Sequence, residues 1–86
     1  MAYSVEFLPA ALKQLAKLDK PAQRRILSFL EERAADRPRD VGAATTGELA
    51  GFWKYRIGDY RAVCRIDDGR LTVLVVKVGH RREVYR

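Results

Sequence analysis

The sequence is poor in the residues that usually carry metal or thiol chemistry. It has one cysteine, Cys64, and one histidine, His80, among 86 residues. A single cysteine excludes an internal disulfide, and neither residue has a second Cys or His at the spacing of a zinc site. We therefore expect no metal and no other cofactor.

Long apolar runs are also missing. The longest, Leu71 to Val76, is interrupted by Thr72 and followed by Lys77, which favours a buried strand over a membrane span. The N-terminus has neither a basic start nor the apolar block of a signal peptide. We expect one domain over residues 1–86, in the cytoplasm and away from membranes.

Positive charge is concentrated in the second half of the chain. Residues 1–50 hold eight Lys or Arg against seven Asp or Glu, a net of +1, whereas residues 51–86 hold nine against four, a net of +5. A basic surface of this kind favours a polyanionic partner such as nucleic acid, although an acidic protein also fits.

The stretch 51–61 alternates apolar and basic side chains. Because successive side chains of a strand point to opposite faces, Lys54 and Arg56 share one face. The other face carries Trp53, Tyr55 and Ile57. We interpret these three as core residues under the helices. Gly58-Asp59 then predicts a turn.

The run from Tyr60 to Ile66 alternates in the same way. One face carries Arg61, Val63 and Arg65, and the other carries Tyr60, Ala62, Cys64 and Ile66. Cys64 is therefore predicted to be a core residue. Two neighbouring strands each present cations from one sheet face, which suits the binding of phosphates better than the making of a core.

The remaining patterns complete a predicted order of β-α-α-β-β-β. The expected strands are Tyr3–Phe7, Phe52–Ile57, Tyr60–Ile66 and Leu71–Val78, and the expected helices run from Ala10 or Ala11 to Leu18 and from about Pro21 to Ala34 or Ala35. Asp67-Asp68-Gly69 indicates a hairpin that uses positive φ. The fold class is α+β, with a helical hairpin on one face of a small, mostly antiparallel, twisted sheet.

Two connections carry specific expectations. Residues 41–47 are small and polar, which indicates a surface connection. Gly79 permits a bend after the last strand, and this bend would bring Arg81 and Tyr85 over the cationic face.

Two sequence blocks, Leu49–Arg61 and Val78–Tyr85, closely resemble those of the RelE toxins of type II toxin–antitoxin systems, within the RelE/ParE superfamily. The first reads Leu-x-Gly-x-Trp-Lys-Tyr-Arg-Ile-Gly-Asp-Tyr-Arg, and the second Val-Gly-His-Arg-x-x-Val-Tyr. The resemblance implies a metal-independent endoribonuclease that cuts translated mRNA in the 30S decoding site of the ribosome. It also implies a cognate RelB-like antitoxin and a toxin–antitoxin hetero-oligomer that binds operator DNA.

The resemblance assigns catalytic roles to Lys54, Arg56, Arg61, Arg81 and Tyr85. Arg56 departs from close relatives, which often have lysine there. Cleavage would use the neighbouring 2′-OH, with Arg56 and Arg61 on the phosphate and Arg81 at the leaving oxygen. Arginine stays protonated, so the general base is either Lys54 or Tyr85. Supporting RNA contacts are expected from Arg65, Lys77, His80, Arg82 and Arg86.

Three alternatives remain at this point. Lys54 and Arg56 fit the solvated face of any half-exposed strand. A ParE-like poison of DNA gyrase has the same superfamily fold, and fold alone does not separate it from a nuclease. An inactive homologue that only binds its antitoxin is the third.

Overall fold

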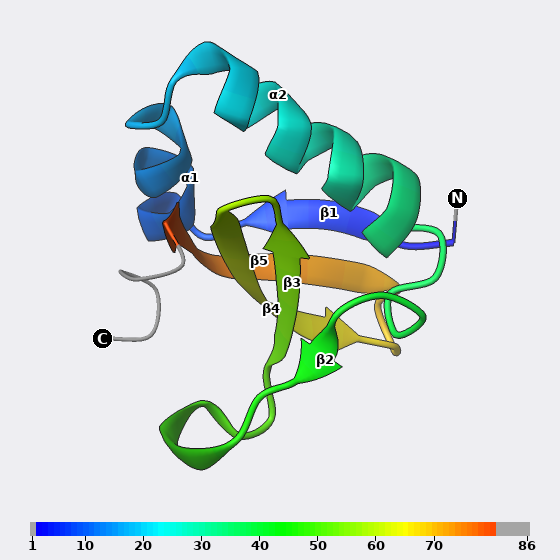
Figure 1. Ribbon diagram of the computed structural model, residues 1–86. Coiled ribbons are helices and arrows are strands. Elements are labelled where there is room, and N and C mark those ends of the chain that lie inside the picture. The colour runs from blue at the N-terminus through cyan, green and yellow to red at the C-terminus, as the bar shows by residue number, and fades with distance from the viewer. Residues whose placement is uncertain (1, 81–86) are drawn as a thin grey trace.

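Two helices cover one face of a five-stranded mixed sheet (Figure 1). The computed structural model describes residues 2–80. The strands are β1 (Ser4–Phe7), β2 (Ala43–Ala44), β3 (Trp53–Ile57), β4 (Tyr60–Asp67) and β5 (Thr72–His80). The helices are α1 (Pro9–Ala16) and α2 (Lys20–Phe29), and two short helical elements, η1 (Leu30–Ala34) and η2 (Gly47–Leu49), follow them. The predicted α+β fold is confirmed.

The strands lie in the order β1-β5-β4-β3-β2. β1 runs parallel to β5, and the other neighbours are antiparallel. β5 is thus an interior strand, as its apolar composition predicted. The two-residue turn Gly58–Asp59 joins β3 to β4, with Gly58 at φ 60°, which glycine adopts without strain.

Both helices begin at a proline-containing first turn, where a missing N–H costs nothing. α1 ends at Ala16, two residues before the predicted end. The predicted second helix corresponds to α2 continued by the wider π-helical turn η1, which ends at Ala34.

The core lies between the helices and the covered face of the sheet. Its buried side chains include Ala11, Leu15, Ile26 and Leu30 from the helical segments, and Tyr55, Ile57, Cys64, Val73, Val75 and Val78 from the strands. Burial of each large apolar side chain contributes about 1.5–3 kcal/mol. Leu12, part of the predicted apolar stripe of the first helix, is 54% exposed.

Of the two expectations about connections, one is incomplete and one is wrong. Residues 41–47 lie largely at the surface, as expected, but they also contain a strand, because Ala43 and Ala44 pair with Lys54 and Trp53 at the free edge of β3. The chain does not bend at Gly79: this residue pairs with Arg61, and β5 runs on to His80 because β4 offers partners as far as Tyr60.

The β4–β5 turn also differs in detail from its prediction. Its positive φ falls on Leu71, at 49°, and Gly69 is not among the residues of positive φ. β5 carries an irregularity opposite Val63 and Cys64. Beside it, the Val78 amide donates a hydrogen bond of 2.8 Å to Gln14 Oε1, which joins α1 directly to the sheet.

Candidate nucleic-acid interface

Three of the basic residues predicted to be catalytic lie together on the face of the sheet opposite the helices. Lys54 and Arg56 lie on β3, and Arg61 lies on β4 directly opposite Arg56. The three side chains, with Gly42 and Ala43, line a hollow of ≈ 300 Å³. Lys54 and Arg61 are half-buried and Arg56 is exposed. The geometry brings three positive groups around a space that fits a phosphate.

The direct pairing of two arginines has a cost. Cβ atoms of residues directly opposite each other on antiparallel strands lie about 4.5–5.5 Å apart, and like charges there are destabilising. Arg61 Nη1 donates to the carbonyl oxygen of Tyr60 at 3.2 Å, which holds the side chain close to its own strand. A multivalent anion in the hollow would offset the repulsion between Arg56 and Arg61.

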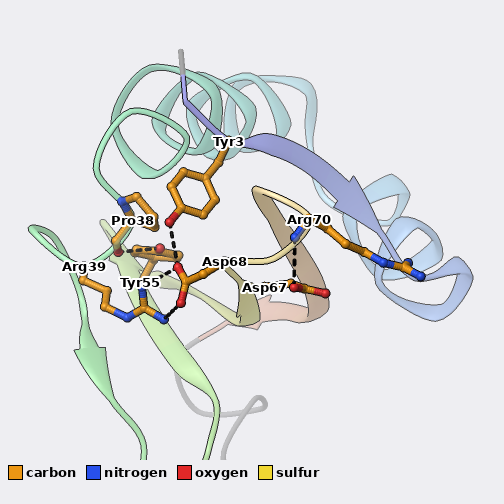
Figure 2. A network of polar contacts seen from close by, with 7 residues as sticks. All are labelled: Tyr3, Pro38, Arg39, Tyr55, Asp67, Asp68 and Arg70. Atoms are coloured by element: carbon orange, nitrogen blue, oxygen red, sulfur yellow. Dashed lines mark hydrogen bonds and ion pairs between the residues drawn. The ribbon is translucent and has the colours of Figure 1, made fainter.

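A strap formed by residues 38–44 closes one side of the hollow, and two aromatic side chains hold it. The buried Tyr55 hydroxyl donates to the Pro38 carbonyl oxygen at 2.7 Å (Figure 2), and Trp53 Nε1 donates to the Val41 carbonyl oxygen at 2.8 Å. Gly42 has φ 76°, and a Cβ there would lie 2.3 Å from the Lys54 carbonyl oxygen. Only glycine fits this close approach.

The same strap is tied to the β4–β5 turn by an exposed polar cluster (Figure 2). Arg39 donates to Asp68 through two nitrogens, at 2.8 and 3.0 Å, and the Tyr3 hydroxyl donates to Asp68 at 2.6 Å. The hydrogen bonds from Arg39 and Tyr3 hold the pKa of the Asp68 carboxyl below its usual value, and the hydrogen bond to Asp68 raises the pKa of the Tyr3 phenol.

The other predicted RNA contacts divide between the two faces. Lys77 shares the cationic face, since Lys54 and Lys77 both pair with Val63. Arg65 lies on that face two residues beyond Val63. His80 pairs with Tyr60 and makes an edge contact with its ring at 6.0 Å. The register therefore places His80 on the opposite side of the sheet from the hollow.

The predicted tail residues Arg81, Arg82, Tyr85 and Arg86 lie outside the described residues. Their roles stay predictions.

The core assignments of Cys64 and Tyr55 agree with their environment. Cys64 is buried, and burial raises the pKa of its thiol to about 12. Burial also raises the pKa of the Tyr55 phenol. Both groups are thus neutral near pH 7, and neither reaches the hollow.

Residues 2–80 hold neither a metal-binding cluster nor a membrane-spanning helix. Within this range no group of three or more His, Cys, Asp or Glu side chains is placed to hold a metal ion. Neither helix in this range is long and apolar enough to cross a membrane.

Sequence reasoning missed three residues of this face. Gly42 and Ala43 line the hollow, but their segment had no alternation long enough to indicate a strand. Phe52 precedes β3 and follows the same alternation as Lys54 and Arg56. That alternation could have placed Phe52 on the cationic face.

Comparisons with known proteins agree with this fold. The family model described as ParE toxin of type II toxin-antitoxin system, parDE, matches residues 5–85. The chain belongs to the RelE/ParE family of toxins from type II toxin–antitoxin systems.

Individual relatives carry RelE-type names. Toxin RelG of Mycobacterium tuberculosis is 36% identical over 86 residues, covering 100% of this chain and 99% of that protein. The toxin–antitoxin complex RelBE2 of Mycobacterium tuberculosis contains a chain with a TM-score of 0.88 and 34% identity, over 94% of this chain and 100% of that one. The isolated Escherichia coli RelE toxin gives a TM-score of 0.77 at 28% identity, over 98% and 92%.

Proposed function

We propose that this RelE/ParE-family toxin is a ribosome-dependent endoribonuclease that cuts translated mRNA without a metal. The observation that carries the proposal is the cluster of Lys54, Arg56 and Arg61 around one hollow on the open face of the sheet. These are the cations that the RelE resemblance assigns to catalysis. A structural surface would not need two arginines in direct cross-strand register.

The proposed reaction is an internal transesterification. The 2′ oxygen attacks the adjacent phosphorus, the bond from phosphorus to the 5′ oxygen breaks, and the products are a 2′,3′-cyclic phosphate and a 5′-hydroxyl end. Arg56 and Arg61 stabilise the extra negative charge of the phosphorane, because planar guanidinium groups match phosphate oxygens. Either Lys54 or Tyr85 takes the 2′ proton. Arg81 stabilises the negative charge on the leaving 5′ oxygen, which takes a proton from water to become the 5′-hydroxyl.

Dependence on the ribosome has a physical reason in this scheme. Charge stabilisation alone does not align the 2′ oxygen, the phosphorus and the leaving oxygen. Holding reactants in line is worth up to about 7–11 kcal/mol. A ribosome that holds the message in the in-line geometry supplies this alignment, so free RNA should be a poor substrate.

The proposed inhibitor is a RelB-like antitoxin. Related toxins crystallised in RelBE complexes have the same fold. An acidic, partly disordered partner that folds over the cationic face would cover Arg56 and Arg61 and remove access to the phosphate. We include binding of the toxin–antitoxin complex to operator DNA in the proposal, as the family resemblance implies.

One observation favours a second candidate. The family model that matches residues 5–85 carries the ParE description, and a ParE-like toxin would act on DNA gyrase. The two candidates differ in their need for the three cations. A gyrase poison gives growth arrest with DNA damage and no new mRNA ends.

The test is a map of mRNA ends bearing a 5′-hydroxyl after brief induction in cells. Intact protein is compared with Arg61→Ala, with the double variant Arg81→Ala, Tyr85→Phe, and with Arg24→Ala. Arg24 is an exposed arginine on the helix-covered side, so its removal controls for net charge.

We expect cuts confined to translated frames at a fixed position within codons. They should be lost in Arg61→Ala and in the double variant, and kept in Arg24→Ala. Growth arrest that survives Arg61→Ala with no new ends would instead identify a gyrase poison. No growth arrest from the intact chain would identify an inactive antitoxin-binding homologue.

A further inference from the structure

The cationic face extends beyond the three-cation hollow in regular rows. Arg56 and Arg61 form the first row, and Lys54 and Lys77, which flank Val63, form the second. The third row is two residues further along the strands, about 6.8 Å away. It contains Arg65, paired with Leu74. The face is therefore long enough to contact more than the phosphate in the hollow.

The third row contains an aromatic ring under a guanidinium group. Phe52 directly precedes β3 and is only partly buried. The Arg65 guanidinium carbon lies 5.8 Å from the centre of the Phe52 ring, within the range of a cation–π contact. Because Phe52 shares the face of Lys54, this pair is a flat platform one row from the predicted catalytic lysine. Aromatic rings and arginine planes are the surfaces on which unpaired bases stack.

A second hollow lies on the other side of Arg65. Its volume is ≈ 650 Å³, within the range of small-molecule sites, and Arg65, Arg70, Leu74 and Glu6 are among its lining residues. This volume is large enough for a nucleotide.

The acidic groups of the β4–β5 turn, which also line this hollow, are largely occupied. Asp68 is turned toward Arg39 and Tyr3, and Asp67 accepts from the Arg70 amide at 3.2 Å (Figure 2). Arg39 offsets the charge of Asp68, whereas Asp67 and Glu6 keep theirs, so the lining of this hollow is balanced rather than positive overall. Arg65 and Arg70 are the two groups in it that a phosphate can contact.

We propose that Phe52, Arg65 and this second hollow bind one nucleotide of the message next to the cleaved step. The base stacks on the Phe52–Arg65 platform, and its phosphate meets Arg65 and Arg70. This inference rests on the proposed nuclease function and adds a specificity subsite to it. Purines present a larger stacking surface than pyrimidines, so cut sites should be enriched in a purine at one fixed offset from the cut.

The first measurement is equilibrium binding of a fluorescently labelled 2′-O-methyl oligoribonucleotide, which lacks the attacking hydroxyl, at low salt. Purine-rich and pyrimidine-rich versions are compared on intact protein, Phe52→Leu, Arg65→Gln and Arg33→Gln. Arg33 is a matched control, since its guanidinium lies 5.3 Å over the Phe29 ring on the helix side. Arg65 is exposed, so Arg65→Gln tests the platform without disturbing the core.

Phe52→Leu and Arg65→Gln should weaken purine-rich binding by roughly tenfold. Arg33→Gln should change it less than about twofold. Arg65→Gln should also lower the salt dependence of binding, whereas Phe52→Leu should leave it unchanged, because only the first removes a charge. Wild-type binding by Phe52→Leu, or an equal loss in Arg33→Gln, would overturn the subsite.

The second measurement is the map of mRNA ends in cells, made with Phe52→Leu beside the intact protein. It separates this inference from the nuclease proposal. Cuts that depend on Arg61 but keep the same base bias in Phe52→Leu would reject the subsite and leave the nuclease standing. If oligonucleotide binding depends on Phe52 but the protein makes no cuts in cells, the subsite stands and the nuclease proposal is rejected. A uniform fall in cutting at all sites with an unchanged base bias would assign the platform to ribosomal RNA and overturn the proposal.

Discussion

The two faces of the sheet differ in what their side chains stabilise. On the helix-covered face, Tyr55, Ile57, Cys64 and Val75 are buried against α1 and α2. On the open face, Lys54, Arg56 and Arg61 surround a hollow, and two of them are arginines placed directly opposite each other. The covered face holds the fold together. The open face carries clustered positive charge, which in the proposed function binds the phosphate of the message.

The strap of residues 38–44 connects the two faces and gives the largest expected change in stability. Gly42→Ala would force a Cβ to within 2.3 Å of the Lys54 carbonyl oxygen and 2.8 Å of Tyr55, at a φ of 76°. We expect a loss of about 3 kcal/mol or more in the free energy of unfolding, measured by denaturant titration.

Gly47→Ala is the control for this variant. Gly47 has a φ of 65°, but nothing lies within 4 Å of the point that a Cβ would occupy there. It should therefore lose only about 1–2 kcal/mol, the conformational cost alone. Equal losses in the two glycine variants would mean that the strap does not pack against β3 as described.

Removing the hydroxyl of Tyr55 should give the next largest loss in the free energy of unfolding. Tyr55→Phe removes the hydrogen bond to the Pro38 carbonyl oxygen and should cost about 1–2 kcal/mol near pH 7. Tyr60→Phe, on the neighbouring strand, is the control and should cost less than about 0.5 kcal/mol.

The Tyr55 effect should depend on pH in a definite direction. Burial raises the pKa of Tyr55 in the folded state, so ionisation above 10.0, its ordinary value, favours the unfolded chain. Tyr55→Phe lacks this ionisation. The stability difference between wild type and Tyr55→Phe should therefore shrink as the pH rises above 10. A difference that stays constant from pH 7 to pH 11 would contradict the burial of this phenol.

Removing an arginine from the open face should change the free energy of unfolding in the opposite direction. Arg56→Gln relieves the repulsion between Arg56 and Arg61 and should raise the free energy of unfolding by roughly 0.2–1 kcal/mol at low salt. The gain should vanish at high salt, because the charges are screened. The same variant should cut mRNA more slowly. Lower stability in Arg56→Gln would show that this pair of arginines supports the fold.

Removing the exposed Asp68 carboxylate should give the smallest change in stability. This change should depend on pH. Because the pKa of Asp68 is lowered in the folded state, its stabilising contribution is present above 3.8, its ordinary value, and is lost as the pH falls through the folded value. Asp68→Asn should thus lower the melting temperature slightly at pH 7 and not at pH 2. Asp59→Asn, an exposed carboxylate in the β3–β4 turn, is the comparison.

The alternation of Lys54, Arg56 and Arg61 was enough to predict which cations share a face, because the side-chain period of a strand is two. The helices and strands were predictable for the same kind of reason. β2 was not, since Ala43 and Ala44 carry no pattern and pair only because the edge of β3 is available. Gly79 was misread as a bend, because a glycine inside a strand and a glycine at a turn look alike in sequence.

The most direct test of the central claim is single-turnover cleavage of mRNA on programmed ribosomes by purified Arg61→Ala, with Arg24→Ala as the charge-matched control. The denaturation midpoint of each variant is measured alongside, so that a loss of activity is not a loss of folded protein. We expect Arg61→Ala to cleave about 100-fold more slowly or worse at an unchanged or higher midpoint, with Arg24→Ala close to wild type. Wild-type cleavage by folded Arg61→Ala would show that the cationic face is not the catalytic surface.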